Sequence, residues 1–146
     1  MANDTLCVFC GQKMGFFRAS GIACAGVYQH ACKDCEWELK DLTEEEQCRR
    51  ALRLGLANEP EKLEKRIEIL SKAEEHRPTC LRCGSKLRFR QVQLLDNSPM
   101  IDGIFSTVFN VLPAVCENCG KYEFYDPEIA ERNEYLLHLI KQDKAE

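Results

Sequence analysis

The chain has 146 residues and a mass of 16.8 kDa, enough for one ordinary domain or two small modules. Its 20 Lys and Arg against 24 Asp and Glu give a net charge of −4, which excludes a strongly basic nucleic-acid coat. A hydrophobic fraction of 45% excludes general disorder, whereas the ten cysteines, most of them paired, point to metal chemistry.

A first module is expected over residues 1–42, which hold half of the cysteines. Cys7 and Cys10 form one pair with two residues between them, and Cys32 and Cys35 form another. The residues after the second pair fit the start of a helix, so this pair is expected near a helix N-terminus.

Two helices are expected over residues 43–78, as a connector between two modules. Thr43 and Glu46 fit a capping box, and the helix that they start is expected to run to about Ala57. Asn58 fits the cap of a second helix, with a proline in its first turn. Its apolar stripe is formed by Leu63, Ile67 and Leu70.

Residues 79–146 are expected to form a second module, in which three strands precede a helix. The strand patterns cover residues 86–90, 108–112 and 121–125, and a long turn is expected over 96–103. Asp126 fits the cap of a C-terminal helix. The apolar residues of this helix are Ile129, Leu136, Leu139 and Ile140.

Four Cys-x-x-Cys pairs carry the strongest chemical signal in the chain. Two residues between cysteines allow a tight turn to aim both sulfurs at one ion, and two such turns complete a tetrahedral shell of four thiolates. We therefore expect two structural Zn²⁺ sites, each built from two successive pairs. The expected ligands are Cys7, Cys10, Cys32 and Cys35 in site one, and Cys80, Cys83, Cys116 and Cys119 in site two.

Alternatives remain at this point for the pairing, the metal and the other cysteines. The pairs can interleave in a cross-braced arrangement, and paired Cys-x-x-Cys-Gly is also the iron knuckle of rubredoxin. Cys24 and Cys48 have no partner at knuckle spacing, and are small buried hydrophobic residues or redox thiols. His30 lies two residues before Cys32 and is expected beside the metal or at the surface rather than among its ligands.

Both modules resemble known zinc-binding domains. Residues 79–126, with Cys80-Leu-Arg-Cys-Gly and Cys116-Glu-Asn-Cys-Gly-Lys, resemble a bacterial zinc ribbon, which implies two knuckles at one end of a three-stranded antiparallel sheet. Residues 6–42 are similar to a four-cysteine bacterial domain of unknown function that looks like a treble clef. That resemblance implies a knuckle, a hairpin and a second ligand pair in the first turn of a helix.

The ligand sets predict a structural role for the metal and no enzymatic activity. A catalytic zinc keeps one coordination position open, whereas four thiolates leave no position for water. The sequence contains no catalytic signature of the zinc-protease, deaminase or serine-hydrolase type. The fold class expected is α+β, a treble-clef-like module and a zinc ribbon joined by a helical connector.

A basic row provides a candidate nucleic-acid interface, formed by Arg82, Lys86, Arg88 and Arg90. Alternation along the strand puts the last three on one face, away from Leu87 and Phe89. Such a row can contact phosphates, and the alternative is a solvated face paired with Glu123. Other functions left open are a redox switch and a module that binds a protein or a second copy through the apolar residues Met100, Ile101, Ile104 and Phe105.

The expected location is the cytoplasm. The N-terminal residues lack the basic and apolar regions of a secretory signal, and no apolar stretch reaches 18 residues. In a reducing compartment, paired cysteines are more often metal ligands than disulfides. The sequence therefore predicts a cytoplasmic adaptor that contacts nucleic acid or protein and no membrane.

Overall fold

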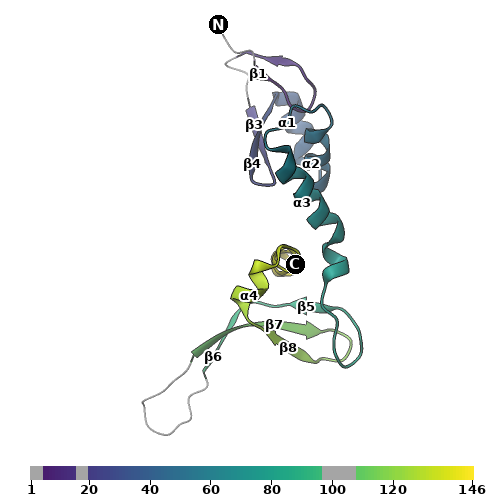
Figure 1. The fold of residues 1–146 in the computed structure, drawn as a ribbon, viewed down its shortest axis with the longest axis vertical. Helices are drawn as coiled ribbons and strands as arrows, with labels where there is room; N and C mark the ends of the chain where they lie inside the picture. Colours follow the sequence, from purple (N-terminus) through teal and green to yellow (C-terminus); the bar gives the residue numbers. More distant parts are fainter. Residues whose placement is uncertain (1–4, 16–19, 97–107) are drawn as a thin grey trace. The chain divides into compact units, whose positions relative to one another are not determined.

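A computed structural model describes residues 5–15, 20–96 and 108–146 (Figure 1). The chain divides into two compact units, Met1–Ser71 (unit 1) and Lys72–Glu146 (unit 2). Within the described ranges, no helix has the length and apolar character needed to cross a membrane. The apolar loop residues proposed above as a docking tip, Met100 to Phe105, lie outside the described residues.

Unit 1 combines short hairpins with three helices. Strand β1 (Thr5–Leu6) pairs with β2 (Lys13–Met14), and β3 (Ser20–Cys24) pairs antiparallel with β4 (Val27–Ala31). The turn between β3 and β4 has only two residues, Ala25 and Gly26, with φ of 53° and 73°. Two positive φ angles in succession define the turn that suits the twist of a hairpin. Helices α1 (Lys33–Lys40), α2 (Glu44–Leu52) and α3 (Pro60–Lys72) follow.

The two connector helices pack into the core of unit 1 with the first cysteine knuckle. The capping box is confirmed, since Glu46 N–H donates to Thr43 and Thr43 N–H donates to the Glu46 carboxylate. Helix α2 ends at Leu52, earlier than expected, because the φ of +68° at Gly55 is incompatible with a continuing α-helix. The shared core consists of Cys7, Val8, Phe9, Met14, Cys24, Val27, Ala31, Leu39, Cys48, Ala51 and Leu63.

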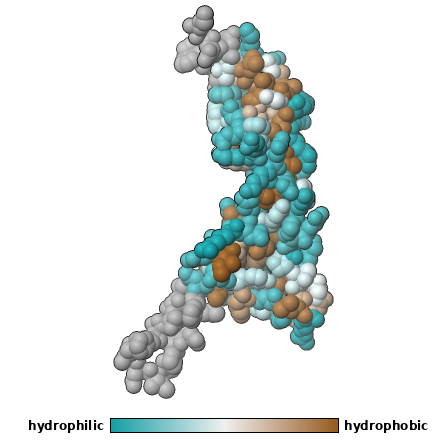
Figure 2. All heavy atoms as spheres, viewed as in Figure 1, coloured by the Kyte–Doolittle hydropathy of each residue, from teal (hydrophilic) through white to brown (hydrophobic). Residues whose placement is uncertain are grey.

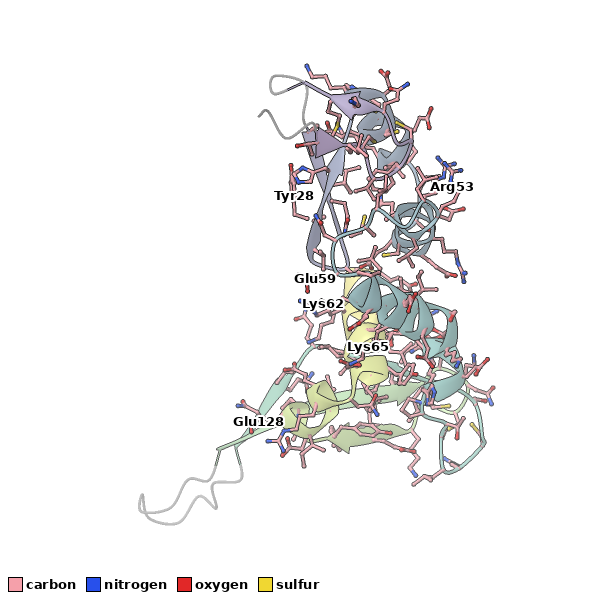
Figure 3. All side chains as sticks on the ribbon, turned by 45° about the horizontal axis from the view of Figure 1, so that its top comes forward. Tyr28, Arg53, Glu59, Lys62, Lys65 and Glu128 are labelled. Carbon is pink, nitrogen blue, oxygen red and sulfur yellow. The ribbon has the colours of Figure 1, made fainter. Side chains whose placement is uncertain are left out.

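Asn58 is not the cap of α3 but the partner of a buried glutamine. The Gln29 side chain is fully buried; its amide donates to the Asn58 carbonyl at 2.9 Å and accepts from Asn58 N–H at 2.8 Å. The Asn58 side chain in turn donates to the Tyr28 carbonyl. These bonds attach the start of α3 to the hairpin. In Figure 3 Glu59 and Lys62 point toward one another in the first turn of α3, where they form an ion pair.

Unit 2 is built on an antiparallel sheet of four strands, one more than expected. The strands are β5 (Leu87–Phe89), β6 (Gln93–Asp96), β7 (Val108–Cys116) and β8 (Tyr122–Tyr125). The long strand β7 pairs with all three others, with Leu87 opposite Cys116 and Gln93 opposite Val111. Strand β6 lies just before the segment expected to be a turn and includes the first residue of that segment, Asp96. Most of that turn lies outside the described residues.

Helical segments cover one face of this sheet. After the short helix η1 (Ala73–His76), the C-terminal region forms α4 (Pro127–Arg132) and α5 (Glu134–Ala145) rather than one helix. The break is at Asn133, whose side chain accepts from Tyr135 and Leu136 N–H and so caps α5. Of the apolar residues of this region, Leu139 and Ile140 are buried, whereas Ile129 is 65% exposed. The core comprises Ala73, Cys80, Leu87, Phe89, Leu112, Ala114, Cys116, Ala130, Leu139 and Ile140.

Candidate metal centres and the open face of the second sheet

The same cysteine turn occurs three times, beginning at Cys7, Cys80 and Cys116. In each copy the N–H of the glycine four residues on donates to the carbonyl of the first cysteine at 2.8 Å, and the cysteine N–H donates back to the residue after that glycine. The three glycines have φ between +70° and +73°, a conformation that other residues avoid. Glycine at this position therefore allows the tight turn that aims two sulfurs at one point.

The fourth pair is positioned by a helix. Cys32 precedes the first turn of α1, where its carbonyl accepts from Glu36 N–H, and Cys35 lies within that turn. The N–H of Cys32 donates to the Cys7 sulfur at 3.3 Å, which joins the helix start to the first knuckle. Ser20 on β3 also donates to the Glu36 carboxylate, so the hairpin and α1 are held together beside the site.

The eight predicted ligands form two clusters, each of two successive pairs. Within each cluster the four sulfurs all lie within 4.8 Å of one another. The Cys10 and Cys32 sulfurs are 3.8 Å apart, and in site two the distances are 3.6 Å for Cys80–Cys119 and 3.4 Å for Cys83–Cys116. A regular tetrahedron with metal–sulfur bonds of about 2.3 Å separates its sulfurs by about 3.8 Å. Both clusters therefore fit a four-thiolate metal shell, and the interleaved pairing is ruled out.

Hydrogen bonds lower the pKa of at least one sulfur in each cluster and so favour its thiolate form. The Ser85 hydroxyl, the Ser85 N–H and the Asn118 side chain lower the pKa of Cys83 to about 5. Burial raises the pKa of Cys7, but N–H groups of Cys32, Cys10 and Phe9 outweigh it and bring that pKa to about 7. Because metal binds thiolate and not thiol, these hydrogen bonds favour metal binding at neutral pH.

The chemistry available to these clusters is structural. Four thiolates saturate a tetrahedral ion, so no coordination position remains for water or substrate. Each cluster also joins segments distant in sequence: site one joins the first knuckle to α1, and site two joins the turn before β5 to the turn after β7. A bound ion therefore crosslinks each unit, which supports a structural metal role.

Cys24 and Cys48, which sequence reasoning left without partners, meet in the core of unit 1. Both are fully buried, one at the end of β3 and the other on α2. The Cys24 thiol donates to the Cys48 sulfur, which raises the pKa of Cys24 and lowers that of Cys48. Their burial fits the packing role rather than that of an exposed redox thiol. His30, on β4, is not in the four-cysteine cluster, and its ring stacks edge-on against Tyr28.

The predicted basic residues are on the surface of unit 2, but carboxylates neutralise most of their charge. Lys86 pairs with Glu74 at 3.3 Å rather than with Glu123. Arg88 pairs with Glu146 and, at 3.5 Å, with Glu117. Glu117 lies 3.9 Å from Arg90 as well. Glu123 instead accepts from Leu81 N–H and pairs with Lys121.

Sequence reasoning missed two exposed aromatic residues on the same sheet. Tyr122 and Phe124 on β8 are 54% and 57% exposed, and their rings are stacked at 6.4 Å with 20° between the planes. The alternation of side chains along the strand could have revealed them. Tyr125 faces the core and contacts Phe89, so residues 122 and 124 must face away from the core. Hydrophobic and hydrophilic side chains adjoin on the surface of unit 2 in Figure 2.

The fold and the two clusters define an α+β protein with two four-cysteine groups that could each hold a metal ion. Comparisons of this chain with protein-family models, with curated proteins and with solved structures found no match.

Proposed function

We propose that this protein is a non-enzymatic zinc protein whose second unit binds nucleic acid. Zinc is the metal that four-thiolate tetrahedral sites of this kind ordinarily hold. The knuckle, hairpin and helix around site one support a treble-clef-like module. The two knuckles joined by an antiparallel sheet at site two support a zinc ribbon, extended here by a fourth strand.

One observation carries the nucleic-acid proposal: Arg88 and Arg90 alternate with the core residues of β5, and both are exposed at this edge of the sheet. Their neighbours in the strand, Leu87 and Phe89, are buried under the helices, whereas both arginines are exposed. Arginine suits phosphate recognition because its planar guanidinium donates two parallel hydrogen bonds to an oxyanion. Lys86 and Arg82 add positive charge at the strand start and in the adjacent knuckle.

The carboxylates beside these arginines do not prevent phosphate binding. Exposed ion pairs contribute about 0–1 kcal/mol, so Arg88 and Arg90 can exchange Glu117 for a phosphate at small cost. The same carboxylates limit the attraction of the surface for polyanions. We therefore expect binding of moderate affinity at low salt rather than the tight binding of a polycation.

The test compares two double variants with the same loss of charge. Arg88→Gln with Arg90→Gln removes the proposed phosphate contacts, whereas Arg49→Gln with Lys62→Gln removes two exposed cations of unit 1. Fluorescence anisotropy with labelled oligonucleotides gives the affinity across a salt series. Binding that weakens with salt, and a salt slope that falls by about 1.4 for a single strand only in the Arg88/Arg90 variant, supports the proposal. Absence of binding at low salt, or equal effects of both variants, contradicts it.

A further inference from the structure

We infer that the nucleic acid bound by this sheet is single-stranded, with its bases stacked on Tyr122 and Phe124. This inference rests on the proposed function and specifies its ligand. The open face of the sheet combines two features that recognise single strands, cations for the phosphates and exposed aromatic rings for the bases. A duplex hides its base faces inside the stack and cannot use the rings.

The strand register arranges these features in two rows across the sheet. Val115 on the central strand β7 lies opposite Arg88 on one side and opposite Tyr122 on the other. Pro113 lies opposite Phe124, and its carbonyl accepts from Arg90 N–H on the other side. Each row thus runs from a guanidinium, over an apolar centre, to an aromatic ring.

The dimensions of the sheet suit a strand that lies along it. Neighbouring strands are about 4.8 Å apart, so the arginine strand and the aromatic strand are separated by about 10 Å across β7. Pro113 and Val115 between them are buried, so the arginine and aromatic side chains that flank them form the surface of this face. A single strand that runs along β7 can direct its phosphates to β5 and its bases to β8.

The aromatic pair is arranged to be a binding surface rather than part of the core. Tyr125 faces the core from β8, and its ring centroid lies 5.7 Å from that of Phe89. The rings of Tyr122 and Phe124 lie nearly parallel with their centroids 6.4 Å apart, and both residues are more than half exposed. Bases of any sequence can stack on such rings because each base has a π face.

The exposed guanidinium groups of Arg88 and Arg90 favour a nucleic acid over an apolar protein segment as the occupant, because a phosphate can replace the carboxylate that they share. Both arginines share one carboxylate, that of Glu117, at 3.5 and 3.9 Å. This carboxylate holds the guanidinium groups on the face and competes with a phosphate for them. Glu117→Gln therefore releases Arg90 and leaves Arg88 paired with Glu146 alone, without removing a hydrogen-bonding side chain, and we expect it to strengthen binding.

The test uses the full zinc-loaded chain and oligonucleotides that contain 2-aminopurine, whose fluorescence is quenched by stacking. Single-stranded DNA, single-stranded RNA and the matching duplexes are compared. The test variant is Tyr122→Leu with Phe124→Leu, which removes the rings but keeps apolar side chains on the strand. The matched control is Tyr28→Leu with Trp37→Leu, two aromatic residues of unit 1 that are 54% and 69% exposed. Zinc content confirms that every variant is folded.

The expected result is tighter binding of single strands than of duplexes, with quenching of 2-aminopurine. Loss of the two rings is expected to weaken single-strand binding by about 5- to 150-fold per stacked base and to abolish the quenching. Duplex binding and the control variant stay unchanged, and Glu117→Gln binds more tightly. A preference between the DNA and RNA strands identifies the sugar.

The failure of this inference is distinguishable from failure of the proposed function. If single strands and duplexes bind equally, and the ring variant retains affinity and quenching, stacking is overturned while phosphate binding by the arginines stands. Both are overturned if no oligonucleotide binds at low salt, or if this face binds a protein and no nucleic acid.

Discussion

Arg77 and Asp143 form a two-pronged ion pair inside unit 2, with nitrogen–oxygen distances of 2.7 and 3.0 Å. Their side chains are only 6% and 3% exposed. Arg77 also donates to the Leu87 carbonyl, and Asp143 accepts from Phe89 N–H at 2.8 Å. The pair thus connects the segment before site two, strand β5 and helix α5 through groups that are almost entirely buried.

Removal of one member of this pair is expected to destabilise unit 2 strongly. Asp143→Asn removes the buried charge partner of Arg77 and leaves its guanidinium only the half-exposed Glu74, which is expected to cost up to about 3–5 kcal/mol. Glu74→Gln is the control, because Glu74 also pairs with Arg77 but is 49% exposed, and its loss is expected to cost less than about 1 kcal/mol.

Urea unfolding followed by two signals measures this difference. The single tryptophan, Trp37, lies in unit 1, whereas far-ultraviolet circular dichroism reports both units. Asp143→Asn should shift the dichroism transition and leave the Trp37 transition in place. Equal shifts for Asp143→Asn and Glu74→Gln would show that burial does not govern this pair.

Metal removal is expected to unfold each unit. A structural zinc site contributes about 10–16 kcal/mol at neutral pH, which matches or exceeds the 5–15 kcal/mol of net stability typical of a domain. A strong chelator should therefore abolish the native circular dichroism of the zinc-loaded chain, and added zinc should restore it. Retention of near-native dichroism in the chelator would contradict this dependence.

The two sites are expected to lose metal at different pH on acidification. Metal ligands must be thiolates, so protons compete with the ion for the sulfurs, and a sulfur with a lower pKa keeps the ion to a lower pH. The lowest pKa is about 5 in site two, at Cys83, and about 7 in site one, at Cys7. Site two should keep its metal to the lower pH.

Single-site variants separate the two release steps. Cys10→Ser with Cys35→Ser leaves site two as the metal site, and Cys80→Ser with Cys119→Ser leaves site one. A chromophoric zinc indicator records release during stepwise acidification. Ser85→Ala should move release from site two to higher pH, because the Ser85 hydroxyl is the main cause of the low Cys83 pKa. Release from site two before site one would be inconsistent with these hydrogen bonds.

A methyl group at the knuckle glycine of site two is expected to weaken metal binding. Gly84 has a φ of +73°, and alanine in that conformation costs about 1–2 kcal/mol, or about 5- to 30-fold in apparent zinc affinity. Gly15→Ala is the control, because a Cβ at Gly15 meets nothing within 4 Å and its φ is not in the positive region. Competition with a chelator measures both affinities, and equal values for the two variants would refute the argument from backbone strain.

The metal clusters and most helices were predictable because their signals are local. The spacing of Cys7 and Cys10 and the capping box at Thr43 each specify geometry within a few residues, and the structure confirms both. The buried face of β5 was also predictable, since alternation alone puts Leu87 and Phe89 in the core.

Tertiary contacts decided what the sequence did not reveal. Asn58 has the sequence of a helix cap, but the buried amide of Gln29, 29 residues away, binds its backbone instead. The partners of Arg88 come from the end of β7 and from the chain end, and no local pattern connects them. The contact of Cys24 with Cys48 was hidden for the same reason.

The most direct test of the account is to measure how much zinc the anaerobically purified chain binds, and through which atoms. Native mass spectrometry gives the number of ions per chain, and zinc X-ray absorption gives the ligand atoms. We predict two zinc ions per chain, each bound by four sulfurs at about 2.3 Å. Fewer than two ions, or nitrogen and oxygen ligands in place of sulfur, would contradict the claim that eight cysteines form two structural metal sites.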